Sequence, residues 1–278
     1  MMATRLRTSM VLHAILLILA TIGLYPFIYM LVNSLKSGVQ TTVNPWWFTS
    51  WHLMWSNYES AFQATIQSYE RSIFITAVSV VFILFCAALS AYAFARLRFH
   101  GKEILFTVIF ALLLVPGFLT LIPLFIEIKN LHLLSNVWGL ILPYVAGGQA
   151  FAIFILRSFF RAIPDDLFDA AYIDGAGDML IFYRIVLPLS IPILVTLALL
   201  SIVGIWSDFL LPSLVMGASH PTLAVAIVNF QAPALVPSVD VFNIQLAAFT
   251  LSCIPLALSF SFLMRYFVQG MTSGAIKM

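Results

Sequence analysis

Long apolar runs, separated by short polar segments, dominate the pattern along this chain. Six runs contain the roughly 20 mostly apolar residues that a helix needs to cross the hydrocarbon core of a bilayer. Backbone groups in lipid have no water to bind, so each run is predicted to be helical. The predicted spans cover about residues 10–33, 72–95, 103–126, 137–158, 184–212 and 243–267.

Several of these spans contain residues that interrupt helices. A proline inside a helix frees a backbone carbonyl and bends the axis. Such breaks suit a gated pathway, and ordinary packing kinks are an equally open alternative. The positions are Pro116-Gly117, Pro143, Gly147-Gly148, Pro188, Pro192 and Pro255.

Composition excludes an ordinary soluble domain. Apolar residues make up 62% of the 278 residues and charged residues only 9%, with a mean hydropathy of +1.06. Soluble domains are about 25% charged. The net charge of +2 does not indicate a nucleic-acid partner, and Cys86 and Cys253 lie in apolar runs as packing residues. The first run is too long for a signal-peptide core, so we expect a retained span.

The basic residues predict the orientation. With the N-terminus in the cytoplasm, ten of the 13 lysines and arginines lie inside and three (Lys36, Arg71 and Lys129) lie outside. This follows the positive-inside rule and places both termini in the cytoplasm. Segment 34–71 is then extracytoplasmic, and its four tryptophans favour a position along the outer membrane surface; a small folded loop with a tryptophan core is the alternative. No internal repeat or linker is evident, so residues 1–278 are predicted to form a single membrane domain.

Residues that would drive transport or catalysis are missing from the spans. Ion-coupled carriers need ionisable groups near the midplane, but Glu70, Arg71 and Asp208 lie near outer span ends and His13 near an inner one. Gly101-Lys102 lacks the rest of a phosphate-binding loop. The sequence shows no metal-ligand or catalytic pattern. We therefore expect no enzyme activity and no bound cofactor, with energy supplied by another chain.

The stretch DDLFDAAYIDGAGD, residues 165–178, holds five of the 11 acidic residues. It predicts a short cytoplasmic helix within 164–178. Pro164 suits the first helical position, the early aspartates complement the helix dipole, and Gly175 ends the helix. Phe168, Ala171 and Tyr172 share one face. Aspartates do not suit the negative inner leaflet, so the helix is either a docking element for a basic protein groove or a plain solvated helix.

The stretch DAAYIDGAGDMLIFYRIVLPLSIP, residues 169–192, resembles the cytoplasmic signature of permeases of binding-protein-dependent ABC importers. Asp169 stands where the family usually has glutamate. Further segments resemble the carbohydrate-importing subgroup of the maltose and glycerol-phosphate type: 91–106, 122–144, 156–167, 205–214 and 265–277. The matching signature positions are Ala170, Ala171, Asp174, Gly175, Ala176, Leu187, Pro188 and Pro192.

The resemblance implies an all-α polytopic membrane protein with the type I ABC importer permease fold of six transmembrane helices. It implies a bacterial or archaeal inner-membrane subunit, paired with a second homologous permease and two cytoplasmic ATPase subunits that hold ATP and Mg²⁺. An extracytoplasmic binding protein would deliver the sugar. The 164–178 segment would be the coupling helix, and the C-terminal SGAIKM a second ATPase contact. The implied ATPase-coupling residues are Asp169, Ala170, Ala171, Asp174 and Gly175.

Polar residues in or near interrupted spans are candidates for the sugar pathway, because transporter sites lie at such interruptions. Interhelical hydrogen bonding is the alternative for each of them. A stand-alone ion-coupled carrier or channel is the alternative for the whole chain. The pathway candidates are Gln149, Ser201, Trp206, Ser207, Asp208, Asn243 and Gln245.

Overall fold

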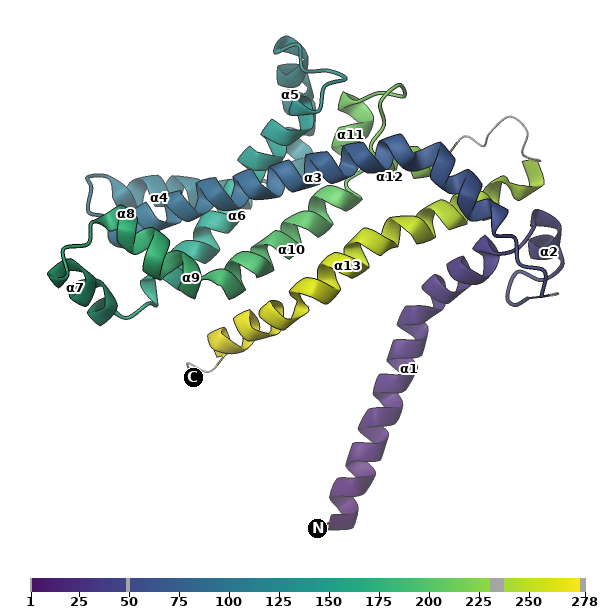
Figure 1. Cartoon of the computed structure of the whole chain (residues 1–278), viewed down its shortest axis with the longest axis horizontal. Helices are drawn as coiled ribbons and strands as arrows, with labels where there is room; N and C mark the ends of the chain where they lie inside the picture. Colours follow the sequence, from purple (N-terminus) through teal and green to yellow (C-terminus); the bar gives the residue numbers. More distant parts are fainter. Residues whose placement is uncertain (1, 49–50, 231–237, 276–278) are drawn as a thin grey trace. The chain divides into compact units, whose positions relative to one another are not determined.

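A computed structural model describes the backbone of residues 2–48, 51–230 and 238–275, and the side chains of residues 12–48, 51–230 and 239–264. Every regular element in these ranges is helical, as the apolar pattern predicted (Figure 1). The elements are α1 (Met2–Ser34), α2 (Gly38–Val43), α3 (Ser56–Arg96), α4 (Lys102–Ala111), η1 (Leu112–Leu114), α5 (Gly117–Asn130), α6 (Trp138–Arg161), α7 (Asp165–Ile173), α8 (Asp178–Ile181), the π-helical turn η2 (Phe182–Val186), α9 (Leu187–Leu189), α10 (Ile191–Ser207), α11 (Leu210–Val215), α12 (Leu223–Val228), η3 (Ser238–Asp240) and α13 (Val241–Ala275).

Four helical segments within the described residues are long and apolar enough to cross a membrane: Leu12–Ser34, Ser56–Arg96, Trp138–Arg161 and Val241–Met264. Two bent pairs of helices raise this number to six if each pair counts as one span. The first pair joins 102–114 to 117–130 at 101°, and the second joins 178–189 to 191–207 at 73°. The spans predicted over 103–126 and 184–212 are therefore broken.

Proline explains where the two breaks fall. Pro116 directly precedes α5 with an extended backbone, and Val115 before it is also extended, because a residue before proline avoids the helical conformation. The second break lies at Ser190, between Pro188 and Pro192. By contrast, α6 continues through Pro143 and α13 through Pro255. Not every proline inside a helix of this chain therefore breaks that helix.

The chain forms two compact units: residues 1–67 with 227–254, and residues 68–226 with 255–278. In the first unit, a polar junction joins the end of α1 to α2 and to the starts of α3 and α13. Asn57 Nδ2 donates to the carbonyl oxygens of Ser34 (2.9 Å) and Lys36 (2.8 Å). Asn243 Nδ2 donates to the carbonyl oxygen of Asn33 (2.7 Å). These bonds satisfy backbone groups where helices end.

Lys36 is the buried cation of this junction, with only 1% of its surface exposed. Its ammonium donates to Asn33 Oδ1 (3.2 Å) and to the Asn44 carbonyl oxygen (2.8 Å). Burial lowers the pKa of Lys36, because desolvation disfavours the charged form.

The segment after α1 exposes its indole rings. Trp46, Trp47, Trp51 and Trp55 are between 58% and 86% exposed. They do not form a tryptophan core, and their exposure agrees with a position along the membrane surface. Because α3 begins at Ser56, the last part of the 34–71 segment is helical.

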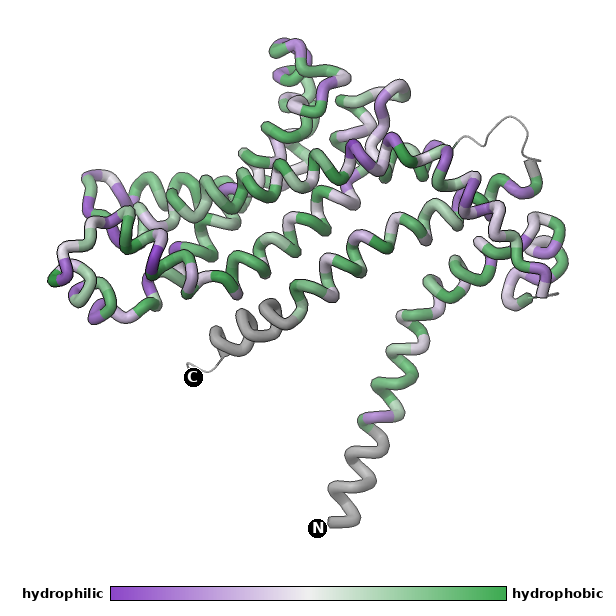
Figure 2. Tube along the Cα trace, in the orientation of Figure 1, coloured by the Kyte–Doolittle hydropathy of each residue, from purple (hydrophilic) through white to green (hydrophobic). Residues whose placement is uncertain are grey.

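In the second unit, α3, α6 and α10 pack around a core of buried side chains. Small residues on α3 allow close helix approach, since Ala87, Ala88 and Ala91 are at most 4% exposed. Figure 2 shows hydrophobic residues along these three helices and hydrophilic residues gathered around α7 and α8. The helix α7 thus lies at the polar end of this packed group of helices.

Candidate functional site

The acidic stretch forms α7, which begins one residue later than predicted. Pro164 lies just outside the helix with an extended backbone, where its missing N–H is of no consequence. Gly175 has a φ of +79°, which glycine adopts without strain. The amides of Gly175 and Ala176 donate to the carbonyl oxygens of Tyr172 (3.0 Å) and Ala171 (2.9 Å). This pair of bonds is a Schellman motif, so Gly175 ends α7 as predicted.

Arg96, at the end of α3, holds α7 in place. Its guanidinium donates to the carbonyl oxygen of Phe160 (3.1 and 2.7 Å) and to that of Ile163 (2.5 Å). It also pairs with the Asp165 carboxylate and lies 3.9 Å from the centre of the Phe168 ring. The planar guanidinium suits this role, because it donates several bonds in fixed directions while its face stacks on a ring.

The predicted face of Phe168, Ala171 and Tyr172 turns in part toward the chain's own core, although Tyr172 stays 49% exposed. Phe168 is only 5% exposed, and Ala171 packs against the core of α3 and α6. Tyr172 donates its hydroxyl hydrogen to Asp178 Oδ1 (2.6 Å), and this bond raises the pKa of Tyr172. Asp178, for which the sequence offered no role, thus accepts a bond that ties α7 to α8.

The opposite side of α7 is free of contacts with the described core and forms what we call the exposed face. Leu167 is 43% exposed and Ile173 is 86% exposed, with Ala170 between them at helical spacing. Carboxylates flank this apolar stripe. The exposed face consists of Asp166, Leu167, Asp169, Ala170, Ile173 and Asp174.

The five predicted coupling residues lie on two sides of α7. Asp169, Ala170 and Asp174 belong to the exposed face. Asp174 also lines, together with Ala171 and Gly175, a hollow of about 320 Å³ next to that face. Leu180, Ile181 and Arg184 contribute to the same hollow. Sequence reasoning missed Ile173 and Arg96. Helical spacing from Ala170 places Ile173 on the same face, so the sequence could have indicated it. No local pattern indicates the role of Arg96, because its partners lie 64 or more residues away in the sequence.

Replacing Gly175 by alanine should destabilise the end of α7 by about 1 kcal/mol, because only the left-handed backbone resists a Cβ there. A Cβ at Gly175 meets no atom within 4 Å, so packing adds nothing. Hydrogen–deuterium exchange of 171–176 measures the change. Gly177→Ala is the matched control, since Gly177 is equally open but has a φ of −81°. Equal exchange in both variants would contradict the assignment.

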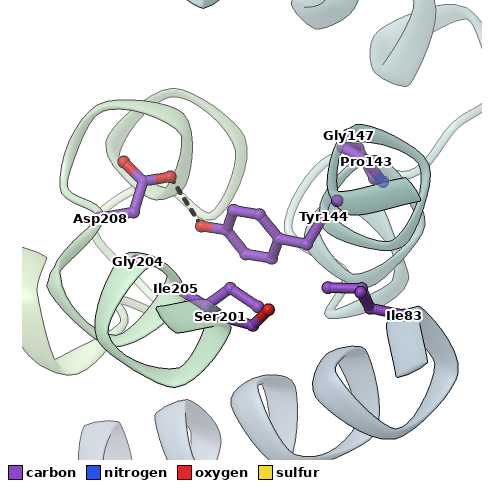
Figure 3. A pocket seen from close by; sticks show the side chains of 9 residues that line it. Ile83, Pro143, Tyr144, Gly147, Ser201, Gly204, Ile205 and Asp208 are labelled. Carbon is purple, nitrogen blue, oxygen red and sulfur yellow. Dashed lines mark hydrogen bonds between the residues drawn. The ribbon is translucent and has the colours of Figure 1, made fainter. Parts of the chain in front are cut away.

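A second candidate site is a hollow of about 260 Å³ between α3, α6 and α10, which we call the Tyr144 hollow (Figure 3). Tyr144 donates its hydroxyl hydrogen to Asp208 Oδ2 (2.8 Å), and Leu210 N–H donates to Asp208 Oδ1 (3.0 Å). Asp208 therefore binds the first amide of α11 and fixes Tyr144. The lining residues are Ile83, Pro143, Tyr144, Gly147, Gly148, Ser201, Gly204, Ile205 and Asp208.

Of the predicted pathway residues in this unit, Ser201 and Asp208 line the Tyr144 hollow. Gln149 Nε2 donates to the carbonyl oxygens of Val145 (3.0 Å) and Ile83 (3.4 Å). Trp206 is 8% exposed and packs edge-on against Tyr69. Ser207 donates to the Val203 carbonyl oxygen one turn back (2.6 Å). Gln149 and Trp206 thus make contacts with α3, and Ser207 bonds within its own helix.

Asn243 and Gln245 belong to the first unit. Besides bonding Asn33, Asn243 Nδ2 donates to Thr41 Oγ1 (2.6 Å), and Gln245 Nε2 donates to the Ile227 carbonyl oxygen (2.8 Å). The predicted tail contact at 273–278 lies outside the described side chains. In the described part of the chain, no group of three or more His, Cys, Asp or Glu side chains is arranged to hold a metal ion.

Comparisons with known proteins agree with this architecture. The model of the family described as "binding-protein-dependent transport system inner membrane component" matches residues 79–273. The diacetylchitobiose uptake system permease protein of Streptomyces coelicolor is 35% identical over 208 residues, which are 74% of this chain and 68% of that protein. The galactooligosaccharides transport system permease protein of Bacillus subtilis is 30% identical over 95% of this chain and 94% of its own length.

A solved structure has the same fold. It is a bacterial ABC transporter involved in the import of the acidic polysaccharide alginate, and its matching chain superposes with a TM-score of 0.80. The sequences are 26% identical, and the match covers 94% of this chain and 97% of the other.

Proposed function

We propose, since this chain belongs to the family of inner membrane components of binding-protein-dependent transport systems, that it forms half of the translocation pathway of an ATP-driven carbohydrate importer. In this proposal α7 is the coupling helix through which closure of an ATPase dimer reaches the spans. Relatives named for diacetylchitobiose and galactooligosaccharides support a carbohydrate cargo.

The observation that carries the proposal is the pairing of a fixed face and an exposed face on one short helix. Arg96 and Tyr172 join one side of α7 to α3, α6 and α8. The exposed face therefore transmits a push or pull to the helix bundle, because α7 is bonded to the ends of the long helices. A solvated helix with no partner has no need of such attachment.

The chemistry of the exposed face suits a soluble protein partner. Leu167 and Ile173 are exposed apolar side chains, at 43% and 86%, and exposed apolar patches mark interaction sites. The acidic rim repels the negative inner leaflet and complements a basic groove. This supports an ATPase subunit as the occupant and a cytoplasmic location for α7, with both termini on the same side.

The remaining partners follow from the same proposal. A second homologous permease would supply the other half of the pathway, two ATPase subunits would hold ATP and Mg²⁺, and an extracytoplasmic binding protein would deliver the sugar. The largely exposed apolar surface of α1, including Leu17 at 71%, is available to lipid or to the second permease. Six spans are counted if each bent pair crosses once.

An Ala170→Trp substitution should reduce co-purification of the ATPase subunit with an affinity-tagged chain by about tenfold. Ala170 is exposed in the middle of the apolar stripe, so an indole there keeps the helix but holds a partner surface away. Immunopurification from native membranes with quantitative mass spectrometry measures the ratio. Uptake of labelled oligosaccharide into ATP-loaded vesicles should fall with it.

Ser158→Trp is the control, because Ser158 is an exposed small residue near the inner end of α6. If both co-purification and uptake survive Ala170→Trp, α7 is not the coupling helix. A stand-alone ion-coupled carrier predicts a different result: sugar uptake by the purified chain in vesicles that have an ion gradient but no ATP.

A further inference from the structure

The Tyr144 hollow combines hydrogen-bonding groups with apolar walls in one small space. Asp208, Tyr144 and Ser201 contribute polar atoms from α6 and from α10 and its C-terminal end. Ile83, Ile205 and Pro143 contribute hydrocarbon. Figure 3 shows Tyr144 reaching across from α6 to Asp208, with Ser201, Ile205 and Ile83 beneath its ring. A sugar ring has the same mixture, with hydroxyl groups at its edge and C–H groups on its faces.

Two glycines open this space. A Cβ built on Gly147 or on Gly204 would meet no atom within 4 Å, although both residues line the hollow. Gly148, the third glycine that lines the hollow, differs from these two. A Cβ on Gly148 would lie only 2.9 Å from the Ile83 side chain. Gly148 therefore permits α6 to approach α3, while Gly147 and Gly204 leave room for a ligand.

The polar groups retain capacity for further bonds. Each Asp208 oxygen accepts one bond from the protein, from Tyr144 or from Leu210. A carboxylate has about four acceptor positions, so it still accepts from hydroxyl donors. The Tyr144 oxygen also remains an acceptor, and the Ser201 hydroxyl both donates and accepts. Sugar hydroxyls match all of these groups.

The hollow has an acidic side chain and no basic one to balance it. Its nine lining residues include one carboxylate and no lysine, arginine or histidine. A uronate carboxylate placed beside Asp208 in a half-buried space meets an uncompensated like charge. A volume of about 260 Å³ is below the range of roughly 300–1,000 Å³ typical for drug-sized ligands, so the hollow suits a single ring.

We infer that the Tyr144 hollow is a subsite for one ring of a neutral saccharide and that Asp208 rejects acidic saccharides. The inference rests on the proposed carbohydrate transport and adds the charge class of the cargo. It separates this chain from the alginate transporter with the same fold, whose cargo is acidic.

The test is ligand-observed NMR on the tagged chain, purified with its associated subunits in lipid nanodiscs. The neutral probes are maltotriose, galactotriose and diacetylchitobiose, and the acidic probe is trigalacturonate. Wild type should bind at least one neutral probe and not trigalacturonate. Asp208→Asn should weaken neutral binding at least tenfold and permit trigalacturonate to bind, because the amide keeps the shape but loses the charge.

Two further variants separate the effect of the Asp208 charge from the effect of the volume of the hollow. Tyr144→Phe keeps the carboxylate, so it should weaken neutral binding without admitting trigalacturonate. Gly204→Val fills the hollow within a helix and should weaken binding of the neutral probes at least tenfold. The inference is overturned if neutral binding is unchanged in both Asp208→Asn and Gly204→Val, if wild type binds trigalacturonate, or if wild type binds no neutral probe. ATPase co-purification judges the transport assignment separately.

Discussion

Replacing Arg96 by alanine should accelerate hydrogen–deuterium exchange of the α7 amides, residues 165–173, by about 100-fold. The variant loses its bonds to the carbonyl oxygens of Phe160 and Ile163 and its contact with the Phe168 ring. Bonds from charged donors contribute about 1.5–3 kcal/mol each in favourable cases, and the exposed pair with Asp165 adds little. A local loss of about 3 kcal/mol corresponds to roughly 100-fold faster opening.

The matched control is Arg98→Ala, which removes the same side chain two residues later, where it is exposed. Exchange of α7 should not change in that variant. Under the proposed function, Arg96→Ala should lose ATP-driven uptake while the chain still reaches the membrane. Unchanged exchange of 165–173 in Arg96→Ala would show that α7 is held by other contacts.

Replacing Arg157 by alanine should lower the free energy of unfolding by about 3 kcal/mol. The Arg157 side chain is 6% exposed. Its Nε donates to the Phe94 carbonyl oxygen (3.1 Å), and its guanidinium lies 3.6 Å from the centre of the Phe106 ring. Removal leaves a buried carbonyl without a partner and a void beside the ring. Unfolding by sodium dodecyl sulfate in mixed micelles measures the change.

Arg157 and Arg161 both pair with Glu103, at 2.6 and 3.0 Å. Arg161→Ala provides the comparison, because Arg161 is 51% exposed. Exposed ion pairs contribute little, so its effect should be much smaller. Arg157→Lys should fall between the two, since a lysine keeps the charge but not the forked donor geometry. Equal losses in Arg157→Ala and Arg161→Ala would place the stabilisation in the exposed pair with Glu103 and contradict this account.

Much of the fold was accessible from the apolar pattern alone. Run length predicts helices in lipid, because backbone groups have no other partners there. Proline indicated the breaks at Pro116 and near Ser190, yet Pro143 and Pro255 lie in continuous helices. A carbonyl freed by proline can find partners in neighbouring helices, and no local sequence pattern reports those neighbours.

The sequence likewise predicted some features of α7 and not others. The acidic stretch, its start after Pro164 and its end at Gly175 follow from local rules about helix ends. The direction of its faces does not, because Phe168 is buried by contacts with Arg96, 72 positions earlier in the chain. Phe168 therefore turns inward, whereas Leu167, Tyr172 and Ile173 are left exposed.

The sequence by itself determined the helical class, the membrane character, the family signature and the place of the acidic helix, since each depends on residues close together along the chain. The tertiary structure decided which face of α7 is exposed, that Asp178 ties α7 to α8, and that Tyr144 meets Asp208 across 64 positions. These features depend on helix packing, which brings together side chains whose separation in sequence carries no periodic signal.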